Sequence, residues 1–509
     1  MSRAPARPNF PARGGDGAPS IAAMTATADI PELGSYVAGE WRQGERRAPD
    51  TNPAHPSEVV AHYALADRDL ATQAIAAASS AAAAWRATPA PARGDVLRKA
   101  AALLDARAEA IGRDLTREEG KTLGEGIRET QLSANILRYF AAQTLDPDGD
   151  TYPSHKANVL LYTRREPLGV VTIITPWNFP ICIAAWKIAP AIAFGNTVVW
   201  KPAELVPLTA AHLLHALVDA GLPQGVVNLV LGKGSEVGDV ITTHPDVVAI
   251  SFTGSNAVGR ALQAKASATG KRVQLELGGK NPAIVLADAD LDLAAEQVAR
   301  GAFLAAGQKC TATSRVIVER SVLAGLMDRL TAHANAWKLG DPLASDTIVG
   351  PVVSEQQLTT VLGYLDRAKS EGASVTAGGG RGTGDLADGY FVKPTVLSGV
   401  KATDTVFREE IFGPVAAVVA VGSFDEAIAI ANDTHYGLSA SIFTRDLGRA
   451  LRFADQIRSG IVKVNSETAG VEYHVPFGGT KESSSGSREQ GKAAREFFTE
   501  WKTIYINFP

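Results

Sequence analysis

The chain has 509 residues and a net charge of −4, and 45% of its residues are hydrophobic and 20% charged. A chain of this length predicts about three domains, and its small negative charge argues against binding to nucleic acid or to an anionic membrane surface. Its two cysteines cannot form a disulfide framework, metal-ligand spacings such as C-x-x-C are absent, and no run of about 18 uncharged apolar residues predicts a membrane span. These features fit a protein of the reducing cytoplasm, and no metal site is expected.

The first 30 residues are rich in Ala, Pro, Gly and Arg and contain little that could be buried, so we expect them to be disordered. Their arginines are typical of a transit peptide, but their prolines would break the amphipathic helix that such a peptide requires. Met24 lies near the end of this segment and is a second candidate for the natural start of translation.

The next part of the chain predicts a strand followed by helices. VAGEW, directly after Tyr36, predicts a short strand, and the Ala-rich stretches after it have a high helix propensity. These helices are expected at residues 67–87, 92–117 and 120–143. Asp, Pro and Gly at 146–150 then break the pattern, and residues 158–165 predict an exposed strand.

A regular α/β alternation follows. Continuous apolar runs predict strands at 169–174, 196–200, 226–231, 247–252 and 272–276, with helices at 180–194, 207–220, 234–243 and 256–268 between them. Uninterrupted apolar runs are typical of parallel strands that are buried on both faces of a sheet. The alternation therefore predicts a doubly wound, Rossmann-like domain, which is the architecture of dinucleotide-binding domains.

A second α/β domain is expected at about 279–480, because the alternation restarts after two glycines. Its helices are expected at 290–306, 321–337, 354–371, 424–432 and 447–457, and its strands at 314–319, 394–397, 415–421 and 460–464. The Gly-rich residues 378–382 predict a surface loop. The C-terminal sequence FFTEWKTIYINF ends in a strand pattern that could pair with residues 158–165 or cross to another subunit.

Glycines mark two strand ends of the first domain. The G-x-G-x-x-G motif is missing after its first strand, but Gly232, Gly234 and Gly238 follow a later strand at the start of a helix. Glycines at a helix N-terminus let backbone N–H groups approach a phosphate, although they also serve simple tight turns. FTGS at 252–255 closes the next strand in the same way. Two glycine-bearing strand ends could therefore flank one ligand.

Lys201 and Glu204 follow the second strand of this domain. An acidic residue at this place can bind the hydroxyl groups of an adenosine ribose, and Lys201 could bind the same ribose or a 2′-phosphate. Because Glu204 would repel that phosphate, the pair favours NAD over NADP. A solvated strand end is the alternative interpretation.

Two residues are candidates for proton transfer and nucleophilic attack. Glu276 lies between two leucines at a strand end, and apolar surroundings raise the pKa of a carboxyl group toward neutrality; a buried ion pair is the alternative. Cys310 lies where a helical run meets a strand, so that its thiol could face a cleft, although most free cysteines are small buried hydrophobic residues. Cys182 is interpreted as such a core residue.

A set of segments in family order resembles the aldehyde dehydrogenase superfamily over roughly residues 33–509. They are TPWNFP at 175–180, KPAE at 201–204, FTGS at 252–255, ELGGKNP at 276–282, GQKC at 307–310, EEIFGPV at 409–415 and PFGG at 476–479. The resemblance implies an α/β fold with a Rossmann-like NAD(P)-binding domain, a second α/β catalytic domain and a small β flap for oligomerisation. The expected boundaries are 1–30 for the N-terminal extension, 31–147 and 167–278 for the NAD(P)-binding domain, 279–480 for the catalytic domain, and 148–166 with 481–509 for the flap and tail.

The resemblance also implies a role for each matched residue. Cys310 matches the nucleophile, Glu276 the general base, Asn178 the amide of the oxyanion hole, and Lys187 a lysine near the active site. The cofactor-binding positions are Thr175, Trp177, Lys201, Glu204, Gly234, Gly238, Phe252, Gly254, Ser255, Leu277, Glu410 and Phe412. The positions that line the substrate tunnel are Phe179, Ile183, Trp186 and Phe477.

The reaction that this resemblance implies is the oxidation of an aldehyde by NAD or NADP through a cysteine thiohemiacetal and a thioester. The tail GGTKESSSGSREQG resembles the branch of the family that oxidises α-ketoglutaric semialdehyde (2,5-dioxopentanoate) to 2-oxoglutarate. Alternatives are another semialdehyde, a broad range of aliphatic or aromatic aldehydes, a CoA-acylating reaction, which Glu276 disfavours, a side activity as a thioesterase and, in a different class, a non-catalytic relative.

The substrate end of the site is less defined. A substrate carboxylate needs a cationic anchor or backbone amides, for which Arg315 and Arg488 are candidates, and residues 467–477 are expected to border the mouth of the tunnel. The resemblance further implies a homodimer or homotetramer.

Overall fold

A computed structural model describes residues 30–509 of the chain. The expectations for the N-terminal extension, namely its disorder and a start at Met24, lie outside the described residues. Within that range, no helix is both long enough and apolar enough to cross a lipid bilayer.

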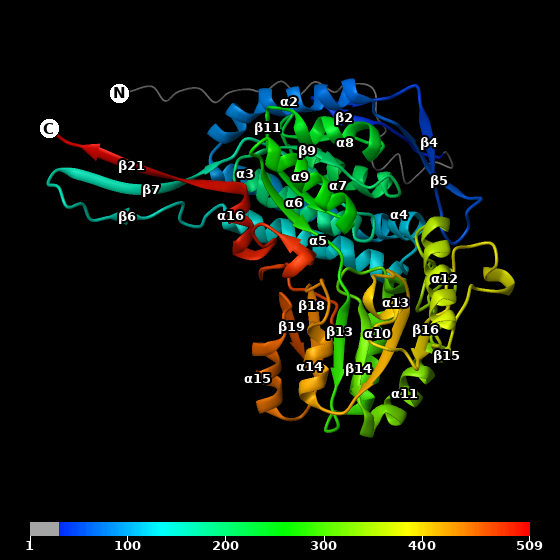
Figure 1. Ribbon diagram of the computed structural model, residues 1–509. Coiled ribbons are helices and arrows are strands. Elements are labelled where there is room, and N and C mark those ends of the chain that lie inside the picture. The colour runs from blue at the N-terminus through cyan, green and yellow to red at the C-terminus, as the bar shows by residue number, and fades with distance from the viewer. Residues whose placement is uncertain (1–29) are drawn as a thin grey trace.

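An eight-stranded sheet forms the centre of the larger domain (Figure 1), with the order β20-β12-β11-β8-β9-β10-β2-β3. Its strands are β2 (Ser35–Val37), β3 (Glu40–Arg42), β8 (Val170–Ile174), β9 (Thr197–Lys201), β10 (Val227–Leu229), β11 (Val247–Thr253), β12 (Arg272–Glu276) and β20 (Ser484–Ser485). The strands from β8 to β12 run parallel, as their apolar runs predict, while β2 and β20 add antiparallel edges.

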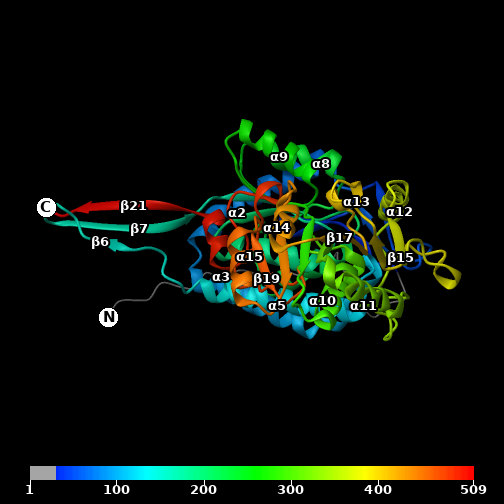
Figure 2. The same ribbon diagram turned by 60° about the horizontal axis from the view of Figure 1, so that its bottom comes forward.

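Helices cover both faces of this sheet (Figures 1 and 2), which explains why its parallel strands are apolar throughout. On one face lie α2 (Arg68–Ala87), α8 (Gly234–Thr243) and α9 (Asn256–Ala268). On the other lie α3 (Ala90–Ala106), α6 (Pro180–Ala193) and α7 (Pro207–Asp219), backed by α4 (Ala108–Glu119) and α5 (Leu123–Gln143). Each face has its own cluster of buried side chains, so the domain is doubly wound as predicted.

A seven-stranded sheet forms the second domain, with the order β15-β16-β17-β14-β13-β18-β19. Its strands are β13 (Asn281–Val285), β14 (Thr313–Glu319), β15 (Ser374–Ala377), β16 (Thr395–Ser398), β17 (Val415–Val421), β18 (Ser439–Phe443) and β19 (Ile461–Val464). Its helices are α10 (Leu291–Phe303), α11 (Leu323–Ala336), α12 (Glu355–Ser370), α13 (Thr405–Arg408), α14 (Phe424–Asn432) and α15 (Leu447–Gln456). Only β15 pairs antiparallel in this sheet.

An arm of three strands, in the order β21-β7-β6, projects from the body of the molecule (Figure 2). It consists of β6 (Thr151–Tyr152), β7 (Val159–Pro167) and the C-terminal β21 (Thr499–Asn507), which follows the short helix α16 (Ala494–Phe498). β21 pairs antiparallel with β7 along its whole length, and the Arg165 guanidinium lies 3.8 Å from the centre of the Trp501 ring. The predicted pairing of the C-terminal strand with residues 158–165 is therefore confirmed within one chain.

Several predicted elements were wrong in detail. The helix expected at 92–117 is two helices, α3 and α4, because the chain leaves the helical conformation at Arg107 (φ −109°, ψ 7°) and both helices then pack on α5. VAGEW is not one strand but the β2–β3 hairpin, whose turn uses positive φ at Ala38 and Gly39. The helix expected to reach residue 306 ends at Phe303, where a 3₁₀ turn begins.

Some strands were missed because they are short or carry polar residues and prolines. They are β13, β15 and β18 of the second domain, and β1 (Glu32–Leu33), β4 (Arg47–Thr51) and β5 (Val59–Ala64), which form a separate three-stranded sheet. β13 begins with Asn-Pro and β18 reads SASIF, so neither shows the apolar run that identifies its neighbours.

The two main sheets meet at the ends of their strands. Residues 277–280 lead directly from the end of β12 to the start of β13. The carboxyl ends of the parallel strands in the first sheet therefore face the amino ends of those in the second. Loops from both sheets converge at this junction.

Phe140 tests the core behind α6. Its side chain is fully buried in the cluster that joins α3, α5, α6 and α7. We expect Phe140→Ala to lower the free energy of unfolding of this domain by about 3–5 kcal/mol, because it leaves a cavity that close-packed neighbours cannot fill. Thermal denaturation measures the loss against Leu145→Ala, whose side chain is 72% exposed and whose removal changes stability by less than about 0.5 kcal/mol. Equal melting temperatures for the two variants would contradict this packing.

Candidate active site

A cavity of ≈ 250 Å³ lies at the junction of the two sheets. It is lined by Pro176, Trp177, Asn178, Ile183, Thr253, Gly254, Ser255, Leu277, Gly278, Cys310, Gln357, Glu410 and Phe412. Residues 176–178 follow β8, and residues 253–255 lie at the end of β11. These two strands are neighbours at the point where the strand order of the sheet reverses. Open α/β sheets bind their ligands at this place. The cavity thus brings together residues that the sequence predicted from widely separated motifs.

Cys310 enters the cavity from the second domain, between a 3₁₀ turn (Leu304–Gly307) and β14. The turn has positive φ at Ala305, Ala306 and Gly307, and a side chain at Gly307 would collide with the backbone of Gly413. Burial, with the nearby Glu410 and Glu276 carboxylates, raises the pKa of the partly exposed Cys310 thiol to about 12. The resting side chain is therefore a protonated thiol at neutral pH.

Asn178 lies opposite on the loop after β8 and is buried. Its side-chain amide donates to the Gln308 carbonyl oxygen at 2.9 Å, which fixes it against the backbone that leads into Cys310. A primary amide carries two N–H groups, so one donor is left for a ligand in the cavity. Gln308 was not predicted as a site residue; its own side chain accepts from the Val353 N–H and ties this turn to the residues before α12.

Glu276 ends β12 and is buried next to the cavity. One carboxylate oxygen accepts from the Ser484 hydroxyl at 2.6 Å, and the other has no hydrogen-bond partner among the described residues. Burial, and second the Glu489 carboxylate, raise the pKa of Glu276 well above its usual value. The buried ion pair that was considered for this residue is not formed, since its one hydrogen bond comes from a neutral hydroxyl.

Lys187 does not line the cavity. It lies in α6, fully buried, where it forms an ion pair with Glu489 and donates to the Ser251 hydroxyl at 2.9 Å. Glu489 also accepts from the Trp186 ring nitrogen at 2.7 Å. The charge of Lys187 lowers the pKa of Glu276, against the larger rise from burial and from Glu489. Sequence reasoning missed Glu489, although it lies in the tail sequence SREQG.

Glu410 and Phe412 precede β17 and form another wall of the cavity. Glu410 accepts from the Gly279 N–H at 2.8 Å, and burial raises the pKa of its carboxyl group to about 7. The Phe412 and Trp177 rings meet edge to face with their centres 5.3 Å apart. Gln357, which was not predicted, supports this wall by donating to the backbone oxygen of Phe412 at 2.9 Å.

The remaining cofactor positions divide into two groups. Lys201, Glu204 and Gly234 lie together, because Glu204 accepts from the Gly234 N–H at 2.8 Å and lies 3.9 Å from the Lys201 ammonium; Gly238 lies in α8 facing open space. Thr175 and Phe252 are buried supports that do not line the cavity. The Thr175 hydroxyl accepts from the Trp200 ring nitrogen at 3.0 Å, and the Phe252 ring packs so closely that a side chain at position 254 would lie 2.6 Å from it.

The predicted tunnel residues are aromatic and apolar side chains near Asn178. Ile183 lines the cavity, and the Trp186 and Phe477 rings lie with their centres 5.5 Å apart. Phe179 follows Asn178 directly, and the Lys121 ammonium lies 4.1 Å from the centre of its ring.

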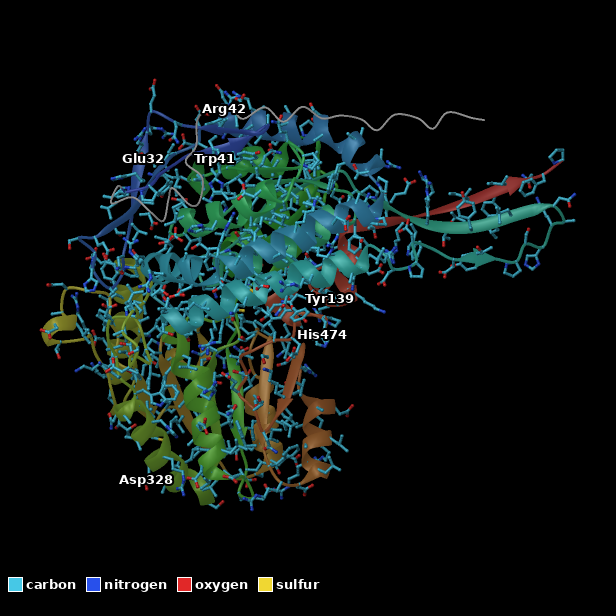
Figure 3. All side chains as sticks on the ribbon, turned by 180° about the vertical axis from the view of Figure 1, so that it is seen from behind. Glu32, Trp41, Arg42, Tyr139, Asp328 and His474 are labelled. Carbon is cyan, nitrogen blue, oxygen red and sulfur yellow. The ribbon has the colours of Figure 1, made fainter. Side chains whose placement is uncertain are left out.

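The loop of residues 467–477 reaches across to the first domain. In Figure 3 His474 lies beside Tyr139 of α5, and the Tyr139 hydroxyl donates to the His474 carbonyl at 3.5 Å. Arg315 is buried and donates to the backbone oxygens of Lys280, Ile430 and Ala431, so it is a structural residue and not an anchor for a substrate. Among residues 30–509, no three His, Cys, Asp or Glu side chains are grouped in a way that could hold a metal ion.

Alkylation tests the high pKa of Cys310. Because the raised pKa keeps the thiol protonated, we expect reaction with iodoacetamide to be slow at pH 7 and to accelerate steadily as the pH rises above 9. Mass spectrometry of the labelled peptide measures the rate, and Cys310→Ser should abolish the labelling because buried Cys182 is inaccessible. A rate that levels off below pH 8 would contradict the burial described for this thiol.

Comparison with known proteins places these features in one family. The model of the aldehyde dehydrogenase family matches residues 41–504. The α-ketoglutaric semialdehyde dehydrogenase of Bacillus subtilis is 46% identical over 475 residues, which cover 93% of this chain and 97% of that protein. The 2,5-dioxopentanoate dehydrogenase of Saccharolobus solfataricus is 42% identical over 473 residues, or 92% of this chain and 98% of that protein.

Solved structures with the same fold are also aldehyde dehydrogenases. The crystal structure of betaine aldehyde dehydrogenase from Staphylococcus aureus in complex with NAD⁺ matches with a TM-score of 0.91 and 37% identity, covering 93% of this chain and 95% of that one. The resemblance that the sequence motifs indicated is confirmed over nearly the whole described chain. This chain belongs to the aldehyde dehydrogenase family.

Proposed function

We propose that this aldehyde dehydrogenase oxidises 2,5-dioxopentanoate to 2-oxoglutarate, with Cys310 as nucleophile and NAD as the preferred oxidant. The observation that carries the catalytic assignment is that Cys310 and Asn178, from loops of two domains, line one cavity, and that Glu276 is buried at the strand end directly before Leu277, which also lines it. A nucleophile, an oxyanion donor and a base are the groups that acyl transfer to water requires.

The cavity fits the nicotinamide half of a dinucleotide. The Thr253 hydroxyl is buried in its wall with no hydrogen-bond partner among the described residues, and the Glu410 carboxylate is held at its rim by the Gly279 N–H. Phe412 and Trp177 add an aromatic wall, and the bound cofactor would supply the acceptor for a hydride. Glu204, beside Lys201, favours NAD because it would repel a 2′-phosphate.

The residues of the chain account for the other steps. The partly exposed Cys310 thiol gives its proton to solvent water, and the thiolate sulfur then attacks the aldehyde carbon, so that the carbonyl oxygen becomes an alkoxide. The free N–H of Asn178 and the backbone N–H of Cys310 stabilise that charge, and one such donor is worth about 3 kcal/mol. When the carbon has been oxidised, a thioester on Cys310 remains. Glu276 then accepts a proton from the water that attacks it, which releases the acid and restores the thiol.

Two observations support the substrate. The B. subtilis and S. solfataricus relatives, both above 40% identity, are named for this semialdehyde, and the tail around GGTKESSSGSREQG resembles the same branch. With Arg315 engaged by backbone oxygens, Arg488 is the remaining cation of the two that the sequence indicated; it is partly exposed, and its charge lowers the pKa of Glu276. A CoA-acylating reaction is disfavoured because it needs no water-activating carboxylate.

The arm supports assembly as a homodimer or homotetramer. Its strand β21 exposes Trp501, Tyr505 and Ile506, and the following Phe508 is 54% exposed. Large apolar side chains gathered on one exposed strand are typical of a surface that pairs with another subunit. A cytoplasmic location stays a prediction from composition.

The choice of substrate and cofactor can be tested directly with purified enzyme. We expect the highest kcat/KM for 2,5-dioxopentanoate with NAD, compared with succinic semialdehyde and with uncharged aliphatic and aromatic aldehydes, with each cofactor in turn. Formation of the reduced cofactor gives the rates. Higher values for uncharged aldehydes would overturn the substrate, and a preference for NADP would overturn the role of Glu204. No reaction with any aldehyde would remove the assignment of Cys310.

Glu276→Gln tests the assigned base. We expect a burst of reduced cofactor equal to one turnover per site, followed by a stall, because the thioester forms but its hydrolysis lacks a base. In the unmodified enzyme, thioester hydrolysis should accelerate as the pH rises through the raised pKa of Glu276, since the carboxyl group accepts a proton only when ionised. The variant should lose that rise. Cys310→Ser is the control and should give no burst, while steady turnover by Glu276→Gln would refute the role.

A further inference from the structure

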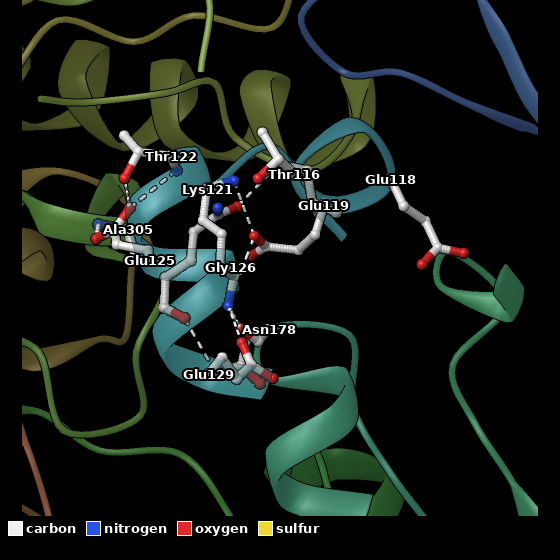
Figure 4. A network of polar contacts seen from close by, with 12 residues as sticks. Thr116, Glu118, Glu119, Lys121, Thr122, Glu125, Gly126, Glu129, Asn178 and Ala305 are labelled. Carbon is white, nitrogen blue, oxygen red and sulfur yellow. Dashed lines mark hydrogen bonds and ion pairs between the residues drawn. The ribbon is translucent and has the colours of Figure 1, made fainter. Parts of the chain in front are cut away.

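A buried lysine lies directly behind the loop that carries Asn178 (Figure 4). Lys121 follows the end of α4, and its ammonium donates to the backbone oxygen of Asn178 at 2.7 Å and to Glu129 of α5 at 2.6 Å. Glu119 lies 3.7 Å from the same ammonium. The side chain of Lys121 is only 1% exposed, so its charge is balanced by fixed groups of the protein and not by water.

Glu129 extends this contact to the helix that follows Asn178. Its second carboxylate oxygen accepts from the N–H groups of Ile181 and Cys182, both at 3.2 Å. These are orphan donors of the first turn of α6, where a negative charge is also favoured by the helix dipole. Lys121 and Glu129 therefore hold the loop before α6 and the first turn of α6 as one unit.

The neighbouring Glu125 contacts the turn that precedes Cys310. One of its oxygens accepts from the N–H and hydroxyl of Thr122 and caps α5, and the other accepts from the Ala305 N–H at 3.0 Å. Ala305 lies in the turn that leads to Cys310. Since the Asn178 amide bonds to the Gln308 oxygen in the same turn, residues 119–129 close a ring of contacts around the oxyanion site.

On the basis of the proposed role of Asn178, we propose that Lys121 is a positioning residue for the oxyanion donor. Its ammonium fixes the Asn178 backbone from behind, through the ion pair with Glu129, so that the free amide N–H stays aimed into the cavity. Preorganised donors lose most of their effect when they are displaced by about 1 Å. Lys121 does not line the cavity. Its ammonium contacts the Phe179 ring and the Asn178 backbone, and of these two residues only Asn178 lines the cavity.

Lys121→Met tests this inference, because methionine nearly keeps the length of the side chain and removes its charge and donors. We expect kcat for aldehyde oxidation to fall about tenfold to hundredfold, as for a misplaced oxyanion donor. KM and the affinity for cofactor should stay within about twofold of the unmodified enzyme, because ground-state binding does not use this donor.

A double-mutant cycle with Asn178→Ala separates positioning from a general structural role. If Lys121 acts through the amide, Lys121→Met should cause no further loss once that amide is gone. Multiplicative losses, or an unchanged kcat in the single variant, would overturn the inference.

The matched control is Lys271→Met. Like Lys121, Lys271 holds a loop through its ammonium, which donates to the backbone oxygens of His244 and Val247, but it precedes β12 at the end opposite Glu276. We expect its kcat to be unchanged.

A second variant covers the case in which Lys121→Met does not fold. Glu129→Gln keeps a side-chain acceptor for the α6 N–H groups and removes the charge that pairs with Lys121. We expect it to lower kcat by a smaller factor than Lys121→Met and to cause no further loss of kcat in the Asn178→Ala variant. If the unmodified enzyme shows no aldehyde oxidation, or if Cys310→Ser oxidises aldehydes equally well, the proposed function is contradicted. Active enzyme with an additive cycle would contradict only the positioning role.

Discussion

Glu276 ends strand β12 of the first sheet and Asn281 begins strand β13 of the second, and only residues 277–280 separate them. This short crossing brings the carboxyl edge of the eight-stranded sheet against the amino edge of the seven-stranded sheet. Asn281 strengthens the junction, because its amide donates to the backbone oxygens of Cys310 and Ala312 at 2.8 Å and its carbonyl oxygen accepts from Ser439. The position of the candidate nucleophile relative to the candidate base thus depends on where two sheets are joined.

Burial of charge at this junction sets the chemistry. Burial, with the Glu410 and Glu276 carboxylates, raises the pKa of the Cys310 thiol, and burial, with the Glu489 carboxylate, raises the pKa of Glu276. Only Glu489 is compensated by an ion pair, through Lys187. A carboxylate left uncompensated in a buried place is destabilised in its ionised form. The same burial that costs folding energy raises the pKa of Glu276, next to the cavity, well above its usual value.

The architecture could largely be predicted because it follows from burial. The strands β8, β9, β11 and β12 were located to within about one residue, as the apolar run of a doubly covered strand is a strong local signal. The break at Arg107 was not predictable, because alanine favours helix on either side and the turn is stabilised by packing on α5. β13 was missed for a related reason. It begins with Asn-Pro, which does not favour a strand by itself, and it is stabilised as a strand by pairing with β14 and β18.

Cys310, Asn178 and Glu276 could be named as candidate site residues from the sequence alone, because short motifs that resemble those of one family carry them in a fixed order. What the sequence did not indicate is which groups hold them. Lys121, Glu129 and Glu489 occur in ordinary helical and tail sequence and become partners of the site only through contacts across dozens to hundreds of residues. The sequence thus determined the fold class and the candidate reactive groups, and the apolar neighbours of Glu276 already indicated a raised pKa. The tertiary structure alone decided which charges act on these groups and how they are held, because those partners come from distant parts of the chain.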